Sequence, residues 1–210
     1  MEHEELLKEY PKLEVCIDSI DSAVSVILKS VANNGTIFTC GNGGSSADAL
    51  HIVGELMKSF KIPRPIDEGK LKGIKDPVRR KEFTKWLESG IRAQSLVSEI
   101  GLITAFANDR NPEMVYAQQI INLANRGDVL IAISTSGNSR NIINAAELAI
   151  ALDLNVISIT GSSGGRLKDF STVSIMIPET ETDKIQNLTV PIYHEICRLV
   201  EESLYILPTR

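Results

Sequence analysis

The chain has 210 residues, of which 43% are hydrophobic, so it is long enough for one domain with a full core and short for two. Its formal net charge of −5 argues against a nucleic-acid-binding face and against a polybasic membrane patch. The charged first residues do not resemble a signal peptide, and no apolar run approaches the roughly 20 residues that a membrane span requires. Three widely spaced cysteines, Cys16, Cys40 and Cys197, lack metal-binding spacing and predict a reduced, cytoplasmic protein.

The first part of the chain predicts two helices with a strand between them. Residues 4–33 carry apolar side chains at helical spacing, and Pro11 is expected to break or bend the first turns. Residues 36–40 form a short β-rich run, after which a glycine-rich loop leads into a helix over about 45–60. Residues 63–92 are highly charged, hold three of the eight prolines and show no strand pattern. We predict a surface insertion there, with an amphipathic helix through Val78, Phe83, Trp86 and Leu87.

The remainder of the chain alternates strands with helices. Residues 95–98 are a weak strand, 101–110 a helix-and-loop segment, 128–134 a strong buried strand and 140–152 a helix. Further strands follow over 155–160 and 173–178, and a last helix begins near Thr182. Strands that alternate with helices form parallel sheets covered on both faces. We therefore expect a single α/β domain over residues 1–210, a three-layer α/β/α sandwich with long N- and C-terminal helices.

Three of the predicted strands end in loops of small polar residues, with the sequences GNGGSS, STSGNS and TGSSGG. Ligands of open parallel sheets bind beyond the carboxyl ends of the strands, where a helix N-terminus favours an anion. None of the loops is a Walker A or dinucleotide-binding motif, and turn and capping preferences alone explain TGSSGG. The four hydroxyls of STSGNS exceed what capping needs. This loop predicts a phosphate site, suited to a phosphate on a small sugar.

Two helices carry candidate chemical groups. His51 and Glu55 are four residues apart, so on a helix they share one face. Such a pair is usually a weak surface ion pair, but this helix opens out of a ligand-type loop, which favours metal ligation or proton transfer. In the last helix, Gln186 and His194 lie off the apolar stripe and about 12 Å apart along the axis, with Pro191 between them to kink the helix. Periodicity alone assigns those two residues no role.

Four stretches occur in order and cover most of residues 35–205: CGNGGSSADALHIVGEL, AFANDR, GDVLIAISTSGNSRNII and TDKIQNLTVPIYHEICRLVE. Together they resemble the sugar isomerase (SIS) domain family, specifically its phosphoheptose isomerase branch, whereas STSGNS alone indicates only the wider superfamily. The resemblance implies a Rossmann-like sandwich and a homotetramer with active sites at subunit interfaces. It also implies conversion of sedoheptulose 7-phosphate to D-glycero-D-manno-heptose 7-phosphate, for the heptose of bacterial lipopolysaccharide, capsule or glycoconjugates.

The resemblance also implies roles for residues at matching positions. Glu55 and His194 correspond to the acid/base pair. One zinc ion per subunit is implied, with the ligands His51, Glu55, Gln186 and His194. The substrate-binding positions are spread over the loops and the last helix, and they are Asn42, Gly43, Gly44, Ser45, Glu55, Asn108, Asp109, Ser134, Thr135, Ser136, Ser139, Asp183 and Gln186.

The implied chemistry is an aldose–ketose exchange, which moves a proton between C1 and C2 through an enediol. It needs a base at carbon and an acid at oxygen, and a metal ion would polarise the carbonyl group. Zinc ligation would lower the basicity of Glu55. We therefore rank Glu55 as the base first and as a metal ligand second.

Two features depart from the family pattern. The insertion at 63–92 stands where the family has a short linker, and the strand in RAQSLV is more polar than the family's. We expect the insertion to cover the site or to add a subunit contact. The alternatives are a non-catalytic regulator of the initiator-associating SIS type, a sugar-phosphate sensor, and an isomerase of another phosphosugar. Glu55 and His194 favour catalysis, since the regulator and the sensor need no acid/base pair.

Overall fold

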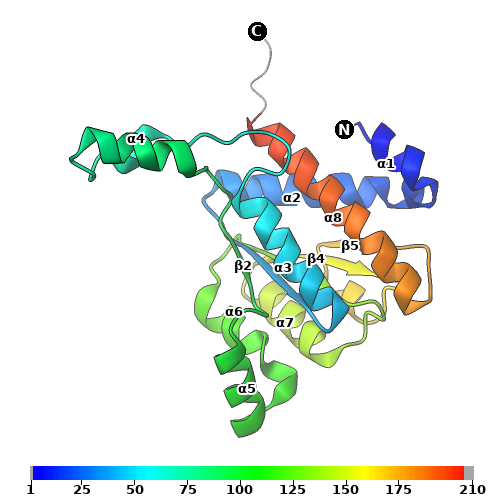
Figure 1. Cartoon of the computed structure of the whole chain (residues 1–210). Coiled ribbons are helices and arrows are strands. Elements are labelled where there is room, and N and C mark those ends of the chain that lie inside the picture. Colours follow the sequence, from blue (N-terminus) through cyan, green and yellow to red (C-terminus); the bar gives the residue numbers. More distant parts are fainter. Residues whose placement is uncertain (1, 206–210) are drawn as a thin grey trace.

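Five parallel strands form the central sheet, in the order β2-β1-β3-β4-β5. In chain order they are β1 (Ile37–Gly41), β2 (Ala93–Ser95), β3 (Val129–Ile133), β4 (Asn155–Thr160) and β5 (Val173–Met176). The structure is a computed structural model that describes residues 2–205. Every residue of β1 and β3 is buried, because helices cover both faces of the sheet (Figure 1). The chain adds β2 on one side of β1 and β3 on the other, so the strand order reverses between β1 and β3.

Alternate residues of the central strands face two separate hydrophobic cores. Val129, Ile131 and Ile133 of β3 face the core formed with α2 (Ile17–Ala32), α3 (Gly44–Met57) and α8 (Thr182–Tyr205). Leu130 and Ala132 face the core formed with α6 (Ala117–Leu123) and α7 (Arg140–Ala151). A third helix, α5 (Ile100–Asp109), packs at the edge of this second core. Helices on both faces of a parallel sheet make the predicted three-layer sandwich.

The predicted elements are present, with shifts at their boundaries. Pro11 separates α1 (Glu4–Glu9) from a 3-10 helix (Pro11–Cys16) that leads into α2, as its missing backbone donor predicts. The strand predicted over 95–98 is wrong in position, because the pairing with β1 starts at Ala93 and ends at Ser95. Among the described residues this edge strand pairs only with β1, and its apolar pattern is weak, so its register depends on β1 rather than on its own sequence. Helix α8 continues through Pro191.

Within residues 2–205, no helix is long and apolar enough to cross a membrane. The three cysteines in this part of the chain are buried and free. They therefore pack as small apolar side chains, as their spacing predicts.

Residues 66–87, which we call the arm, leave the body of the protein. Helix α4 (Pro77–Trp86) lies in the arm, which projects from the side of the molecule (Figure 1). Asp76 caps this helix through the backbone N–H of Val78, and Pro77 occupies its first position, so the helix forms where the sequence predicts. Its apolar side chains do not pack in a core, because Val78 and Trp86 are 74% and 71% exposed. Within one chain, the apolar face of α4 has no partner surface in the described residues.

A buried ion pair anchors the base of the arm. The Arg64 guanidinium and the Glu201 carboxylate are fully buried, with 2.8 Å between Arg64 Nε and Glu201 Oε1. The same guanidinium donates to the carbonyl oxygens of Leu56 and Glu55 at the end of α3. Pro65 forms an antiparallel bridge with Glu88, where the chain re-enters the body. The arm is therefore attached to α3 and α8 next to the candidate site.

Candidate active site

Three loops rich in small residues meet at the carboxyl edge of the sheet. Asn42, after β1, and Asn141, in the first turn of α7, exchange side-chain hydrogen bonds of 2.8 and 2.9 Å. Gly137, after β3, approaches the loop after β4 so closely that a Cβ atom on it would lie 2.1 Å from the carbonyl oxygen of Gly164. The loops after β1 and β3 flank the reversal of strand order. This is the place where open parallel sheets bind their ligands.

The loop STSGNS presents hydroxyl groups at the N-terminus of α7. Ser134 is buried and donates a hydrogen bond of 3.2 Å to the hydroxyl of Ser139, while Ser136 is exposed. The side chain of the N-cap residue Ser139 makes no capping hydrogen bond at the N-terminus of α7, although Asn141 Oδ1 accepts one of 3.1 Å from the backbone N–H of Ile142. The first backbone N–H groups of a helix and its positive dipole end attract anions. Thr135 and these serines therefore line an edge that suits a phosphate.

The glycine-rich loop after β1 contacts the last helix. Gly43 has φ 55° and ψ −122°, a conformation that favours glycine, and it precedes α3. A Cβ atom on Gly44 would lie 2.6 Å from Nε2 of Gln186, so the side chain of Gln186 lies directly against the backbone at the start of α3. Ser45, the next residue, is buried. The structure thus brings Gln186 of α8 to the loop that opens α3.

His51, Glu55 and His194 form one cluster between α3 and α8. His51 Nε2 lies 3.1 Å from Glu55 Oε1, and Lys58 Nζ lies 2.8 Å from the other carboxylate oxygen. The rings of His51 and His194 pack edge to face, with 5.1 Å between their centroids. His194 Nε2 is buried and has no hydrogen-bond partner among the described residues. The expected acid/base residues are therefore neighbours within a single chain.

The surroundings of the cluster set the charges of its members. Burial raises the pKa of Glu55, but the hydrogen bonds and charges of Lys58 and His51 outweigh it, so the pKa lies below 4.5. Burial and the charge of His51 lower the pKa of His194 from 6.5, against the raising effect of Glu55. At neutral pH the carboxylate of Glu55 is therefore ionised and the imidazole of His194 is neutral.

Comparison with protein families assigns the chain to a known family. Residues 89–194 match the model of the SIS domain, and residues 5–85 match a second model of the same description. This chain belongs to the SIS domain family. Phosphoheptose isomerase of Helicobacter pylori (strain P12) is 34% identical over 199 residues, which cover 95% of this SIS chain and 90% of the relative. The enzyme of that name from a Nitratiruptor species is 35% identical over 184 residues, 88% and 86% of the two chains.

Solved structures agree with this assignment. Phosphoheptose isomerase of Neisseria gonorrhoeae matches with a TM-score of 0.74 and 28% identity, covering 95% of this SIS chain and 94% of the other. Phosphoheptose isomerase of Francisella tularensis matches with a TM-score of 0.76 and 25% identity, covering 96% and 100%. The predicted family and fold are confirmed.

The side chains that are expected to bind zinc include suitable donors. Imidazole and carboxylate groups are common zinc ligands. Among residues 2–205, no group of three or more His, Cys, Asp or Glu side chains is arranged to hold a metal ion. However, His51 Nε2 faces a carboxylate oxygen of Glu55, and the buried Nε2 of His194 lacks a partner in the described chain. The donor chemistry of these three residues fits a cation at this position.

Three of the expected substrate-binding residues lie apart from the cluster. Asn108 donates a hydrogen bond of 2.8 Å to Asp109, and both are exposed at the end of α5. Asp183 is exposed in the first turn of α8, one turn before Gln186. None of their contacts in the described residues reaches His51 or Glu55. One chain alone therefore does not join them to the candidate acid/base pair.

Three residues of the cluster were not predicted from the sequence. Tyr193 lies 2.9 Å from His51 Nδ1 through its hydroxyl, and burial raises the pKa of Asp48 against the opposing influence of Tyr193. Lys58 donates a hydrogen bond to the carboxylate of Glu55, as described above. Asp48 precedes His51 by one helical turn, which is a weak local signal. Nothing in the sequence near Tyr193 indicates that it contacts α3.

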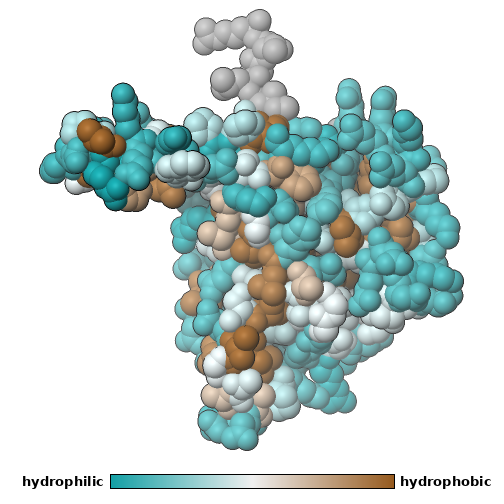
Figure 2. All heavy atoms as spheres, viewed as in Figure 1, coloured by the Kyte–Doolittle hydropathy of each residue, from teal (hydrophilic) through white to brown (hydrophobic). Residues whose placement is uncertain are grey.

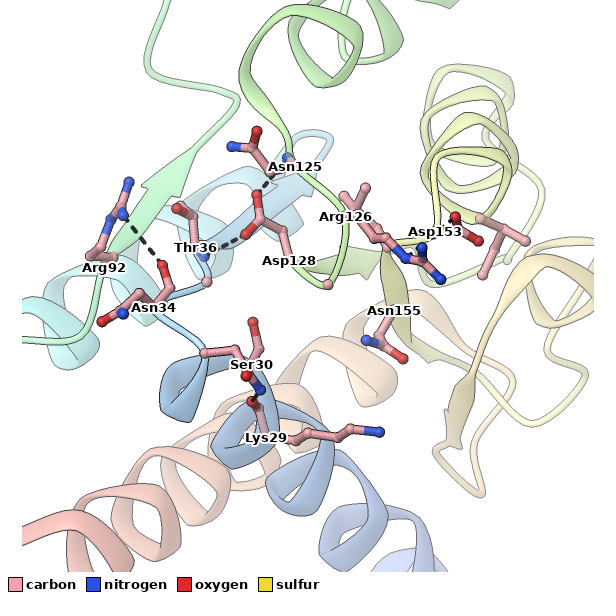
Figure 3. A pocket seen from close by; sticks show the side chains of 15 residues that line it. Lys29, Ser30, Asn34, Thr36, Arg92, Asn125, Arg126, Asp128, Asp153 and Asn155 are labelled. Carbon is pink, nitrogen blue, oxygen red and sulfur yellow. Dashed lines mark hydrogen bonds and ion pairs between the residues drawn. The ribbon is translucent and has the colours of Figure 1, made fainter.

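Of two further cavities, one lies away from this cluster and the other borders it at His194. One of about 760 Å³ is at the opposite, amino-terminal edge of the sheet (Figure 3). There Asp128 accepts hydrogen bonds of 2.8 Å from the backbone N–H groups of Thr36 and Asn125, which join the segments that enter β1 and β3. The C-terminal ends of α2 and α7 border this cavity, and their carbonyl groups disfavour anions. The second cavity, about 390 Å³, is lined by His194, Tyr10 and other residues of α1 and α8.

Proposed function

We propose that this protein is an aldose–ketose isomerase that converts sedoheptulose 7-phosphate to D-glycero-D-manno-heptose 7-phosphate. Relatives that match nearly the whole chain are named phosphoheptose isomerase. The observation that carries the proposal is the convergence of Glu55 and His194 on His51. A non-catalytic regulator or a sugar-phosphate sensor would need the serine-rich loop, but it would not need a carboxylate beside two imidazoles.

The phosphate group binds at the loop after β3. Ser134, Thr135, Ser136 and Ser139 offer hydroxyl groups, and the N-terminus of α7 offers backbone N–H groups and a favourable dipole. Binding energy from this remote, non-reacting group positions the carbonyl end of the sugar at the acid/base pair. Asn42, Gly43, Gly44 and Ser45 line the sugar between the two.

Glu55 acts as the base at carbon. From the ketose, its ionised carboxylate takes a proton from C1, while the oxygen on C2 gains a proton and the enediol forms. Return of the proton to C2, with loss of the proton on the C1 oxygen, gives the aldose. His194 serves the two oxygens, because its neutral ring can both donate and accept a hydrogen bond. The low pKa of Glu55 keeps the base in its active form at neutral pH.

We further propose one zinc ion per subunit, held by His51, Glu55, Gln186 and His194. The donor types and the unpartnered Nε2 of His194 support this assignment. When bound, zinc supplies Lewis-acid polarisation of the sugar carbonyl. Because ligation would lower the basicity of Glu55, its role as base still ranks above its role as ligand. Metal analysis of the purified protein tests the assignment directly.

Self-association is the third element of the proposal. We propose a cytoplasmic homotetramer in which a neighbouring copy supplies Asn108 and Asp109 to the site, in the service of bacterial heptose synthesis. Figure 2 shows a band of hydrophobic residues on the surface over the middle of the molecule. Exposed apolar side chains of α3 and α5 support an interface, since exposed apolar patches often mark interaction sites. They are Leu50, Met57, Ile100 and Leu102.

The insertion supports a further subunit contact. Residues 63–92 hold nine Lys or Arg and five Asp or Glu, a net charge of +4, so the rest of the chain carries −9 against a total of −5. The basic arm and its exposed Trp86 and Val78 therefore complement the acidic body of a second copy. We propose that the arm contacts a neighbouring subunit beside the site.

An activity assay tests the enzyme assignment. The purified protein is incubated with sedoheptulose 7-phosphate, with and without a chelator, and the aldose product is followed by NMR. We expect turnover by the natural chain and a loss of about 100-fold or more in Glu55→Gln and in His194→Ala, because general acids and bases contribute about 10²–10⁴-fold. Full activity in either variant would contradict the assigned roles. Binding of the phosphosugar without turnover by the natural chain would favour a regulator instead.

Removal of the arm tests its contact. Replacement of residues 67–87 by two small residues keeps the bridge between Pro65 and Glu88 and the buried Arg64. We expect a smaller oligomer by light scattering, or a raised KM, in this shortened chain. Unchanged assembly and kinetics would rule out both a subunit contact and a cover over the site.

A further inference from the structure

The loop that follows β4 is hydrogen-bonded to the loop that is proposed to bind phosphate. We call residues 161–167 the brace and residues 134–139 the phosphate loop. Three backbone N–H groups of the brace donate hydrogen bonds of 2.9 to 3.1 Å to the phosphate loop. The pairs, with the donor first, are Gly161 with the carbonyl oxygen of Thr135, Arg166 with Oδ1 of Asn138, and Leu167 with the carbonyl oxygen of Gly137. Turn preferences explain the composition of the brace, but they do not explain three bonds to one other loop.

Glycines allow the backbones of the two loops to touch. A Cβ atom on Gly165 would lie 2.5 Å from the carbonyl oxygens of both Ser136 and Gly137. From the other side, a Cβ atom on Gly137 would lie 2.1 Å from the carbonyl oxygen of Gly164. A side chain at either glycine would therefore displace backbone atoms of the facing loop. The brace thus supports the phosphate loop along its backbone, at a distance that only glycine permits.

The carbonyl oxygens of the phosphate loop are all occupied from Ser134 to Gly137. Their donors, in chain order of the acceptors, are the N–H groups of Gly137 and Gly161, Nδ2 of Asn138, and the N–H group of Leu167. A carbonyl oxygen carries a partial negative charge and can only accept a hydrogen bond, so it would repel a phosphate. These hydrogen bonds therefore engage the groups that would oppose an anion, and the brace supplies two of the four donors.

The N–H groups of the same loop are left available. In a planar trans peptide unit the C=O and N–H bonds point in opposite directions. Because Gly161 fixes the carbonyl group of Thr135, it also fixes the N–H group of Ser136, which points away from the brace. Within residues 2–205, no group accepts a hydrogen bond from the N–H of Thr135 or Ser136. Together with the first N–H groups of α7, these are donors for an anion.

We propose that the brace, through Asn138 and Gly165, positions the phosphate loop so that its carbonyl groups turn away from the bound phosphate and its N–H groups face it. This inference rests on the proposed function, and it assigns a role in that function to a second loop. Asn138 links the two loops, because its Oδ1 accepts from the brace while its Nδ2 donates to the carbonyl oxygen of Ser136. Both are positioning residues that act through the N–H groups of Thr135 and Ser136.

Titration of the ¹⁵N-labelled protein with inorganic phosphate tests the brace, with the backbone N–H signals of the phosphate loop as the readout. In the natural chain, the signals of Thr135 and Ser136 should shift with added phosphate and saturate. Gly165→Ala should raise the phosphate Kd about 10- to 100-fold, the effect of losing a hydrogen bond to a charged group. Asn138→Ala keeps the two backbone bonds from the brace, so its rise should be smaller, about two- to tenfold.

Two control variants separate this contact from general effects of the same substitutions. Gly127→Ala also places alanine at a positive φ, of 87°, but it lies at the opposite edge of the sheet with nothing within 4 Å of the added Cβ atom. Asn122→Ala on α6 removes an exposed side chain that donates a hydrogen bond of 2.7 Å to a backbone carbonyl oxygen. The phosphate Kd should be unchanged in both controls.

Kinetics and unfolding distinguish positioning from a purely structural role. With sedoheptulose 7-phosphate, Gly165→Ala should raise KM by a factor similar to that for the phosphate Kd, and kcat should change less, because Glu55 and His194 are untouched. A purely structural brace would lower the unfolding temperature of Gly165→Ala and leave both the phosphate Kd and KM in place. Circular dichroism at the assay temperature confirms that each variant is folded.

The outcomes separate this inference from the proposed function. An unchanged phosphate Kd in Gly165→Ala overturns the inference, and so does an equal rise in Gly127→Ala, because strain at the glycine would then be the cause. An unchanged Kd in Asn138→Ala overturns the role of that side chain. If the natural chain binds no phosphate at these N–H groups, the phosphate site fails and the inference fails with it. Phosphate binding without turnover overturns the isomerase assignment alone, and the weaker binding of Gly165→Ala would still support the brace.

Discussion

Replacing Arg64 with methionine should destabilise the protein by about 3 kcal/mol at pH 7. Methionine fills much of the same buried space, but it leaves the carboxylate of Glu201 without its cation. Removal of one partner from a buried ion pair costs about 3–5 kcal/mol. Glu201 keeps hydrogen bonds of 2.7, 2.7 and 3.0 Å from the backbone N–H groups of Phe60, Lys61 and Ile62, so we expect the lower end of that range. Such a loss is large beside a total stability of roughly 5–15 kcal/mol.

The pH dependence of this loss identifies its source. Burial raises the pKa of Glu201, but the hydrogen bonds from the backbone and the contact with Arg64 outweigh it, so the folded pKa lies below 4.5. A carboxylate with a lowered folded pKa stabilises fully above its unfolded pKa, and this contribution is lost as the pH falls through the folded pKa. The difference in unfolding free energy between the natural chain and Arg64→Met should therefore be greatest near neutral pH. It should narrow below about pH 4.5.

Urea unfolding at a fixed protein concentration measures both effects. The matched control is Arg79→Met, which breaks an exposed ion pair with Glu82 on α4 and should cost no more than about 1 kcal/mol. Equal losses in the two arginine variants would refute the reasoning, because burial would then make no difference. A gap between the natural chain and Arg64→Met that does not change with pH would show that lost packing, rather than the buried charge, causes the destabilisation.

Two further predictions concern the site. Lys58→Met should raise the pKa of Glu55, because Lys58 lowers that pKa in the natural chain, so the acid limb of the kcat/KM profile should move to higher pH. Lys70→Met on the arm is the control. An unmoved acid limb in Lys58→Met would exclude Glu55 as the titrating base. Gly44→Ala should raise KM, because its Cβ atom would displace the Gln186 side chain, whereas Gly54→Ala in the same helix, with nothing within 4 Å, should leave KM unchanged. Equal KM values in the two glycine variants would remove Gln186 from the substrate site.

Local sequence patterns were sufficient for the architecture. The apolar runs of β3 and β4, the helical spacing before and after them, and the break at Pro11 depend on neighbouring residues in the chain. The placement of the GNGGSS and STSGNS loops follows from the same information, since a parallel sheet puts the ends of its strands at one edge. Likewise, the four-residue spacing of His51 and Glu55 becomes a contact as soon as the helix forms.

Contacts between distant segments were decided only by the tertiary structure. Strand β2 is short and its register is set by its pairing with β1, so the position predicted from the sequence was wrong. The packing of α3 on α8 brings His194 and Tyr193 to His51, and Gln186 to Gly44. The buried pair of Arg64 and Glu201 lies within segments that look like a charged insertion and an amphipathic helix. Periodicity shows which face of a helix is buried, but the residue it meets depends on how the elements pack, and that information is not local.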